Sequence, residues 1–486
     1  MISRRFAWPM LFAVVFLCLV VPPAGEALAQ AVQTPAQAQS LAQADRPNIV
    51  FILTDDQQAD TIAALNTTLG QEPGVVNVRT PNIDSLVERG VVFNRAYHQG
   101  AWSGAVCLPS RTMIMTGRTV WHISRPWDEQ KPPPFIDQCL AATFNDAGYD
   151  TFRVCKRGNS FAEANAMFDI NIEERSRGAD GPKLITDHVI EYLDARQAAA
   201  DTDPFLIYYA FTHPHDPRDA PQQYLDQYHA NVPDPDPDAD INLLPPLPRN
   251  YMTAHPFDNG AMNIRDETSV RGVMTNRDDR TIRNELGKYY ATIENLDAEI
   301  GRVLNRLEDP NQDGDTSDSI MDNTYVIFTS DHGLAMGRHG LMGKQNLYEH
   351  SWRVPMIVTG PSIEPGETEA FIYLLDLMPT FCDFASIDIP DAVEGHSFAG
   401  NCTDLEAPGR DMVIGVYTEV QRSIRVGDWK LIWYTKIDRV QLFNLIDDPL
   451  ELSDLSRVQE HAPKVARLRA ALLQRMTELD DPLTKE

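Results

Sequence analysis

Three short apolar runs, each followed by acidic or histidine residues, constrain the fold of this chain more than any other feature. They stand in the segments "NIVFILTDDQ", "DPFLIYYAFTHPH" and "NTYVIFTSDHG". Continuous apolar runs of this length are typical of strands that are buried on both faces of a parallel sheet. Helices are expected between them at 81–89, at about 184–199 and at about 283–307, and in the last of these stretches apolar residues recur with a helical period. Strands that alternate with helices predict a layered α/β domain.

The polar residues that follow the apolar runs are the first candidates for a functional site. In open α/β sheets, ligands bind at the carboxyl ends of the strands, which is where Asp55, Asp56, Asp331 and His332 fall. Two adjacent carboxylates repel each other unless a cation lies between them, so the first pair indicates a divalent metal, although a helix N-cap would also explain it. Three carboxylates and one imidazole form an oxygen-rich set that favours Ca²⁺, or less well Mg²⁺, over Zn²⁺.

Two histidines and two lysines are further candidates. His213 and His215 follow the second run, and because alternate residues of an extended segment point to opposite sides, only one of them can face a given site. Lys156 follows another expected strand, in "TFRVCKRGNS", and Lys344 lies in "GLMGKQNLYEH". Taken alone, either histidine is as consistent with a loop residue as with a site, and a lone lysine is more often a solvated charge.

The N-terminal segment predicts export. A pair of arginines precedes an apolar stretch at 6–21 and then the segment "GEALAQ", a pattern typical of a secretory signal that is cut after Ala29. We therefore interpret 1–29 as a signal peptide and 30–45 as a disordered leader, with an uncleaved membrane anchor as the alternative. After cleavage we expect a periplasmic or secreted protein with no stable membrane insertion.

Charge narrows the range of partners. The formal net charge is −28, from 70 acidic and 42 basic residues. A surface of this kind repels nucleic acids and anionic membranes, so no nucleic-acid partner is expected. If the substrate is itself an anion, its site must provide a local positive field against this background.

The cysteines beyond the expected signal peptide are five in number, and an oxidising compartment would allow four of them to pair. Short loops favour the pairs Cys139–Cys155 and Cys382–Cys402, although four cysteines allow three connectivities. Cys107 is then left over, in the polar segment "SGAVCLPSRTMIMTGR". An odd cysteine in such a setting indicates a chemical role.

Two regions that differ in composition and in expected secondary structure follow the predicted leader. Residues 46–385 carry the features described above and are predicted to form the catalytic domain. Within it, 216–282 is rich in Pro, Asp and Asn and is interpreted as a surface insertion that helps to shape the substrate pocket. Residues 386–486 contain short amphipathic strands, a hairpin turn at "VGDW" and a final helical segment, which predict a small antiparallel sheet with a covering helix.

The segment "CLPSRTMIMTGR" resembles the signature of the type I sulfatases, in which a maturation enzyme oxidises the cysteine to formylglycine. The other motifs stand in the order of that family: "DD" after the first strand, a lysine in the middle, a histidine after a strand, "SDHG" and then "GK". The segment "LFNLIDDPLELSDLS" also resembles the family's closing segment, so the likeness spans roughly 46–456. The resemblance implies an alkaline-phosphatase-like α/β/α sandwich with a large mixed sheet, the smaller C-terminal sheet and a bound Ca²⁺.

The resemblance also implies roles for these residues. The hydrated aldehyde (gem-diol) of residue 107 would attack sulfur with one hydroxyl, and the second would collapse back to the aldehyde and expel sulfate. Arg111 lies four residues after Cys107, so a helix that begins near Pro109 would place both on one face. His215 would protonate the leaving alcohol. The implied catalytic set is Cys107, Arg111, Lys156, His215 and Lys344, and the implied metal set is Asp55, Asp56, Cys107, Asp331 and His332.

The implied function is hydrolysis of a sulfate ester, on a sulfated carbohydrate given the expected export. Many relatives carry a histidine two residues after the middle lysine, but this chain has Gly158, which leaves the base for sulfate release open. A phosphodiester or phosphonate monoester hydrolase of the same fold is the nearest alternative, and a non-catalytic glycan-binding protein is a second. The residues that could line a sugar subsite, and that fit an ordinary surface equally well, are Trp121, His122, Trp127, Arg218 and the insertion.

Overall fold

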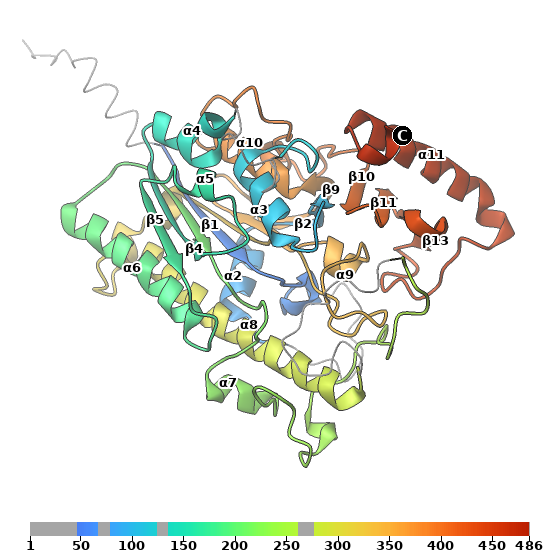
Figure 1. The fold of residues 1–486 in the computed structure, drawn as a ribbon. Helices are drawn as coiled ribbons and strands as arrows, with labels where there is room; N and C mark the ends of the chain where they lie inside the picture. The colour runs from blue at the N-terminus through green and yellow to red at the C-terminus, as the bar shows by residue number, and fades with distance from the viewer. Residues whose placement is uncertain (1–45, 67–77, 124–134, 261–276, 486) are drawn as a thin grey trace, which may run out of the picture. The chain divides into compact units, whose positions relative to one another are not determined.

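The computed structural model describes residues 46–66, 78–123, 135–260 and 277–485, which belong to one compact unit. The predicted signal peptide and leader lie outside the described residues. At the centre of the unit is an eight-stranded sheet with the order β5-β4-β6-β1-β7-β8-β2-β9 (Figure 1). Its strands are β1 (Asn48–Thr54), β2 (Val91–Tyr97), β4 (Asp150–Lys156), β5 (Ile170–Glu174), β6 (Phe205–Ala210), β7 (Thr324–Ser330), β8 (Met356–Thr359) and β9 (Gly366–Tyr373).

The three apolar runs form three adjacent strands, as predicted. β1 lies parallel to β6 on one side, with Leu53 beside Ala210, and parallel to β7 on the other, with Thr54 beside Ser330. Because the three strands end in register, the residues that follow them emerge at the same edge of the sheet. β8 runs antiparallel to both of its neighbours, so the sheet is mixed, as predicted.

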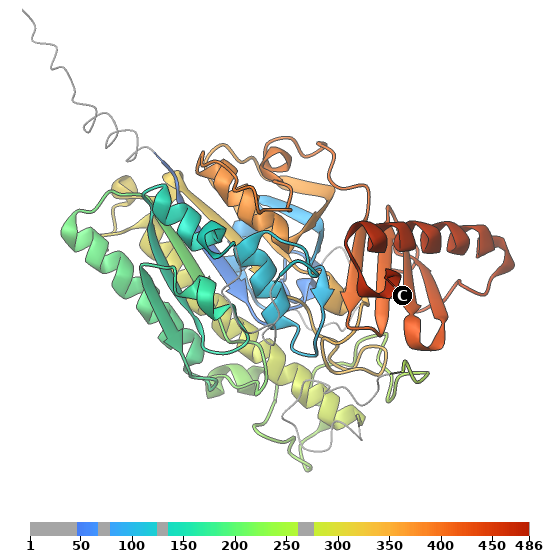
Figure 2. The same ribbon diagram turned by 45° about the horizontal axis from the view of Figure 1, so that its top comes forward.

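Helices cover both faces of this sheet (Figures 1 and 2). Alternate residues of β1 face opposite sides: Phe51 packs with α3, α4 and α10, and Ile52 packs with α2, α6 and α8. This confirms the α/β/α arrangement, and the predicted helices at 81–89, 184–199 and 283–307 correspond to α2, α6 and α8. The helices are α2 (Pro81–Arg89), α3 (Cys107–Thr116), α4 (Leu140–Asp146), α5 (Ala162–Asn165), α6 (Gly181–Ala199), α8 (Asp279–Glu308) and α10 (Leu377–Phe384).

The part of the predicted insertion that the structure describes is anchored on α8. It contains a short helix, α7 (Gln222–Gln227). Leu225 and Tyr228 pack in one apolar cluster with Ala291 of α8. Residues 261–276 of the insertion lie outside the described residues.

A second, five-stranded sheet has the order β13-β12-β11-β10-β3. Its four C-terminal strands are antiparallel and α11 covers them, as predicted. The short strand β3 joins parallel to β10, and a Cβ at Gly100 would lie 1.9 Å from the Val416 carbonyl oxygen, so this approach requires glycine. No helix in the described ranges has the length and apolar character needed to cross a membrane. The elements are β3 (Gly100–Ala101), β10 (Val413–Tyr417), β11 (Gln421–Val426), β12 (Trp429–Tyr434), β13 (Arg439–Asn444) and α11 (Ala462–Glu478).

The prediction of two disulfides is wrong: all five cysteines in the described ranges are free and buried. Cys139, Cys155, Cys382 and Cys402 belong to the apolar core on one face of the large sheet, where a free cysteine packs much as a small hydrophobic residue does. Loop length failed as a guide because helices and a central strand fix these positions independently of their separation in the sequence.

Candidate active site

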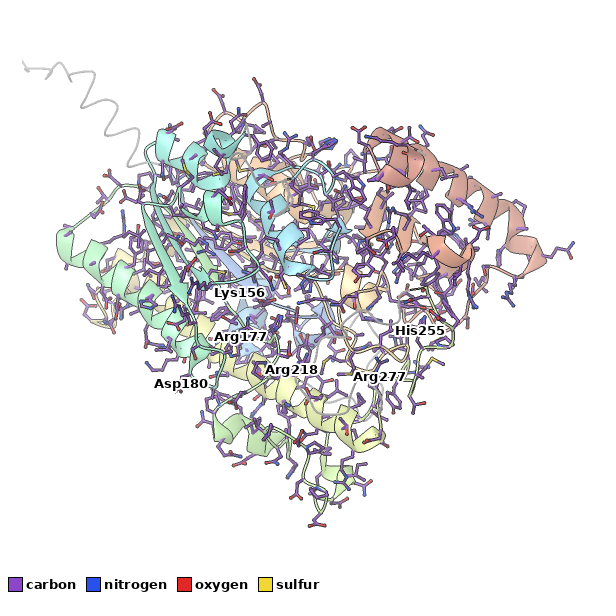
Figure 3. The ribbon with its side chains drawn as sticks, viewed as in Figure 1. Lys156, Arg177, Asp180, Arg218, His255 and Arg277 are labelled. Carbon is purple, nitrogen blue, oxygen red and sulfur yellow. The ribbon has the colours of Figure 1, made fainter. Side chains whose placement is uncertain are left out.

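Side chains from four elements meet at the carboxyl edge of the large sheet. One acidic pair follows β1, an Asp-His pair follows β7, β4 ends in a lysine and α3 begins with a cysteine. Figure 3 shows the lysine, Lys156, at this edge. The residues are Asp55, Asp56, Cys107, Lys156, Asp331 and His332, and none is more than 4% exposed.

Four of these residues fit a metal site. One potential ligand atom from each of Asp55, Asp56, Cys107 and His332 lies within 4.8 Å of the other three. Asp56 Oδ2 is buried and has no hydrogen-bond partner in the described part of the chain, so this carboxylate has an unused ligand atom. Asp331, which was predicted to be a ligand, lies beside this set, with its Oδ1 3.5 Å from His332 Nε2. Carboxylate oxygens with one ring nitrogen suit a hard divalent cation.

Arg111 lies beside Cys107 and is held by contacts with three side chains. Its Nε donates to Asp331 Oδ2 at 2.9 Å, its Nη1 donates to Cys155 Sγ at 2.9 Å, and its Nη2 lies 3.4 Å from Asp55 Oδ2. Helix α3 begins at Cys107, two residues earlier than predicted, so the four-residue spacing places both side chains toward this edge. The Arg111 guanidinium therefore has a fixed orientation.

Two lysines complete the positive charge of the site. Lys344 Nζ lies 2.8 Å from Asp56 Oδ1 and 3.0 Å from Cys107 Sγ. Lys156 forms an ion pair with Asp55. Burial raises the pKa of the Asp55 carboxyl, but Lys156 and the other cations outweigh burial and hold it well below its ordinary value. Burial likewise raises the pKa of Asp56, but Lys344 and the nearby histidines outweigh burial and lower it, so both aspartates remain ionised and available to a cation.

The Cys107 thiol is a weak nucleophile in this setting. Burial raises its pKa far above the ordinary value, and the nearby Asp55 carboxylate raises it further, against the opposing effect of the lysines. The thiol thus stays protonated at neutral pH, whereas the thiolate is the reactive form of cysteine. Cys107 Sγ lies 3.4 Å from Asp55 Oδ1 and 3.3 Å from His332 Nε2.

The two histidines after β6 lie in different surroundings. His215 Nδ1 is 2.9 Å from Asp216 Oδ1, and although burial lowers the pKa of His215, Asp56 and Asp216 raise it above its ordinary value. His213 Nε2 is 3.1 Å from the Gly178 carbonyl oxygen, and burial lowers the pKa of His213 to about 4. His213 thus remains neutral, while His215 can carry a proton.

Two residues that the sequence did not single out fix the site. The Tyr289 hydroxyl, on α8, donates to the Asp56 carbonyl oxygen at 2.7 Å and accepts a hydrogen bond from the backbone N–H of Gln58 at 2.8 Å. These bonds fix Asp56 at a φ of 75°, in the left-handed region that residues other than glycine adopt infrequently. Ser110 Oγ donates to the Asp331 carbonyl oxygen at 2.6 Å. Ser110 stood within a conspicuous motif, but no local signal connects Tyr289 with the site.

Gly158, where the resemblance leads one to expect a histidine, is exposed, and a Cβ added there would meet no atom within 4 Å. The predicted sugar-subsite residues that the structure describes lie in different surroundings. His122 Nδ1 is 2.7 Å from Glu394 Oε1, and Trp121 packs beside the second sheet. Arg218 is fully buried, and Trp127 lies outside the described residues.

Comparisons with known proteins agree with this geometry. The family model "Sulfatase" matches residues 47–387, and "N-sulphoglucosamine sulphohydrolase, C-terminal" matches residues 337–480. The choline-sulfatase of Rhizobium meliloti is 31% identical over 466 residues, which cover 85% of this chain and 82% of that protein.

Solved structures share the fold. A protein in complex with its substrate D-glucosamine-2-N,6-O-disulfate has a TM-score of 0.67 and 21% identity, and the match covers 90% of this chain and 99% of that one. The phosphonate monoester hydrolase of Silicibacter pomeroyi has a TM-score of 0.66 and 20% identity, covering 90% and 96%. These likenesses confirm the predicted alkaline-phosphatase-like fold.

Proposed function

The chain belongs to the sulfatase family of the alkaline phosphatase superfamily and is a sulfuric ester hydrolase, and we propose that it acts outside the cytoplasm on a sulfated carbohydrate. Its nucleophile would be formylglycine, made from Cys107 by a maturation enzyme, and its metal would be Ca²⁺ rather than Mg²⁺. The observation that carries this proposal is the buried position of Cys107 between the Lys344 ammonium, at 3.0 Å, and the Asp55 carboxylate, at 3.4 Å.

Oxidation of Cys107 would resolve a chemical problem. The unmodified thiol has a strongly raised pKa, and the product of its attack on sulfur would have no easy route to release sulfate. A hydrated aldehyde has two hydroxyls on one carbon, so one can attack while the other later expels the product as the C=O bond re-forms.

The charged side chains around residue 107 would bind the sulfate. Arg111, Lys156 and Lys344 lie close enough to surround its oxygens, where preorganised cations stabilise developing negative charge. Ca²⁺ would supply further positive charge and lower the pKa of the hydrated aldehyde. If Asp55 and Asp56 bind the metal, they no longer neutralise Lys156 and Lys344, and the positive charge of both lysines is then available to the sulfate. The proposed ligands are Asp55, Asp56, residue 107, Asp331 and His332.

Replacing His215 with glutamine is expected to lower kcat/KM for an alkyl sulfate by about 10²–10⁴-fold, because the departing alkoxide needs a proton. The loss on 4-nitrophenyl sulfate should be much smaller, since nitrophenolate leaves without one. Initial rates on both esters give the ratio that tests this role. His213→Gln is the matched control, and its ratio should stay at the wild-type value; equal losses on both esters in His215→Gln would contradict the assignment.

Three observations support a sulfated carbohydrate as substrate. The predicted signal peptide favours an extracellular substrate. One structural neighbour was solved with a disulfated glucosamine as its substrate, and the C-terminal family model is that of an N-sulphoglucosamine sulphohydrolase. Choline sulfate is the second candidate, because a choline-sulfatase is among the relatives.

The first test compares matched esters, using protein from a host that matures sulfatases. Rates on 4-nitrophenyl sulfate, 4-nitrophenyl phosphate and 4-nitrophenyl phenylphosphonate share one leaving group, so they report on the transferred group alone. We expect the highest kcat/KM with the sulfate. A higher kcat/KM with the phosphonate would favour the alternative function, that of a phosphonate monoester hydrolase, which is the activity of a structural neighbour.

A further inference from the structure

Arg218 is a buried cation whose hydrogen-bonding groups are only partly used. Its side chain is 0% exposed and lies against helix α8 (Figure 3). Nη1 donates to Glu285 Oε2 at 2.9 Å, but Nε and Nη2 have no hydrogen-bond partner in the part of the chain that the structure describes. Buried donors without an acceptor are costly, so an oxygen that accepts from both would be strongly favoured.

Arg218 shares the carboxylate of Glu285 with a second cation. Glu285 pairs with both Arg218 and Lys288, so one carboxylate serves two cations. Burial lowers the pKa of Arg218, but Glu285, Asp216 and Asp56 outweigh burial and raise it, so the guanidinium stays charged. A positive charge with two unused donors is thus held rigidly inside the protein.

Arg218 lies close to the proposed site, on the segment that carries His215. It follows His215, the proposed acid for the leaving alcohol, by three residues. Its guanidinium carbon is 6.0 Å from the ring centre of Tyr289, whose hydroxyl donates to the Asp56 carbonyl oxygen at 2.7 Å. The whole Arg218 residue is 1% exposed, so its guanidinium, like the Cys107 thiol, is shielded from bulk water.

We propose that Arg218 binds an anionic oxygen group on the alcohol part of the substrate, a carboxylate or a second sulfate close to the scissile ester. The inference rests on the proposed function, because it takes His215 to mark the leaving-group side. Nε and Nη2 form one edge of the guanidinium plane, and this fork matches two oxygens of a carboxylate or sulfate. The same charge disfavours a cationic alcohol such as choline.

Two matched pairs of sulfated sugars and choline sulfate test this specificity in the full-length matured enzyme. Glucosamine 2-N,6-O-disulfate carries an N-sulfate where N-acetylglucosamine 6-sulfate carries an N-acetyl group, and glucuronic acid 2-sulfate carries a carboxylate where glucose 2-sulfate carries a hydroxymethyl group. In at least one pair, the wild-type kcat/KM should favour the more anionic sugar by about 10-fold or more, and choline sulfate should be the poorest substrate. In Arg218→Gln, the preference within that pair should fall to about 1.

Arg218→Lys is a second variant, which keeps the test usable if Arg218→Gln does not fold. It keeps a positive charge for Glu285 but lacks the two-donor fork, so its preference should lie between those of wild type and Arg218→Gln. Equal losses on both members of a pair, or no wild-type preference in either pair, would overturn the inference. If the Arg218 inference fails in this way but wild type hydrolyses 4-nitrophenyl sulfate, the proposed function is not affected. Failure on every sulfate ester would overturn both.

Discussion

Replacing Cys107 with alanine is expected to abolish sulfate ester hydrolysis, with kcat/KM for 4-nitrophenyl sulfate falling by about 10⁴-fold or more. Lys156, Lys344 and Arg111 would still bind the sulfate, but no group would remain to form a bond to sulfur. The loss should therefore appear in kcat rather than in KM. Initial rates of wild type and variant, purified from the same maturing host, measure this difference.

A mass measurement on the same wild-type preparation tests the chemistry behind that loss. The peptide that contains residue 107 should be about 18 Da lighter than its cysteine form, the change expected for conversion of the thiol to an aldehyde. Activity should rise with the converted fraction across expression hosts. Cys382→Ala is the control, because Cys382 is an equally buried free thiol in the apolar core, and this variant should retain its rate. An active preparation with an unmodified Cys107 would contradict the proposal.

The central strands and their helices could be predicted because their signals are local. β1, β6 and β7 are buried on both faces, so each leaves a continuous apolar run in the sequence. Helix α2 has the predicted bounds, since Pro81 opens it and Gly90 follows it. Strand β3 was not predicted, because it has only two residues and its partner strand, β10, lies far away in the sequence. No periodicity exists in so short a strand.

Much of the candidate site could be predicted for the same reason. Asp55, Asp56, Asp331 and His332 follow strands that end together, so their proximity is a consequence of the sheet register. Tyr289 and the Arg218–Glu285 pair could not be predicted, because their partners come from segments distant in the sequence. Which residues of α8 lie next to the edge of the sheet depends on how the helix is positioned along its own axis, and the helical period of the sequence does not specify that position.

A large effect is also expected at the metal site. Asp56→Asn should lower kcat/KM by about 10²–10⁴-fold, which corresponds to the several kcal/mol of transition-state stabilisation that a metal ion supplies. Asp56 offers a buried oxygen with no hydrogen-bond partner in the described residues, so the amide removes a charge that the remaining ligands do not replace. Steady-state rates at saturating Ca²⁺ measure the loss.

Thermal unfolding shows whether that loss reflects the metal. Chelation of wild type should remove activity and lower Tm, and Ca²⁺ should restore both, since a ligand at 100 times its Kd stabilises the native state by about 2.7 kcal/mol. Mg²⁺ should restore less, because it accepts a flexible oxygen-rich site poorly. The Ca²⁺-dependent rise in Tm should be absent from Asp56→Asn but present in Asp60→Asn, whose carboxylate pairs with Arg338. A rise that persists in Asp56→Asn would place the ion elsewhere, and Asp56 would then act only as the counter-ion of Lys344.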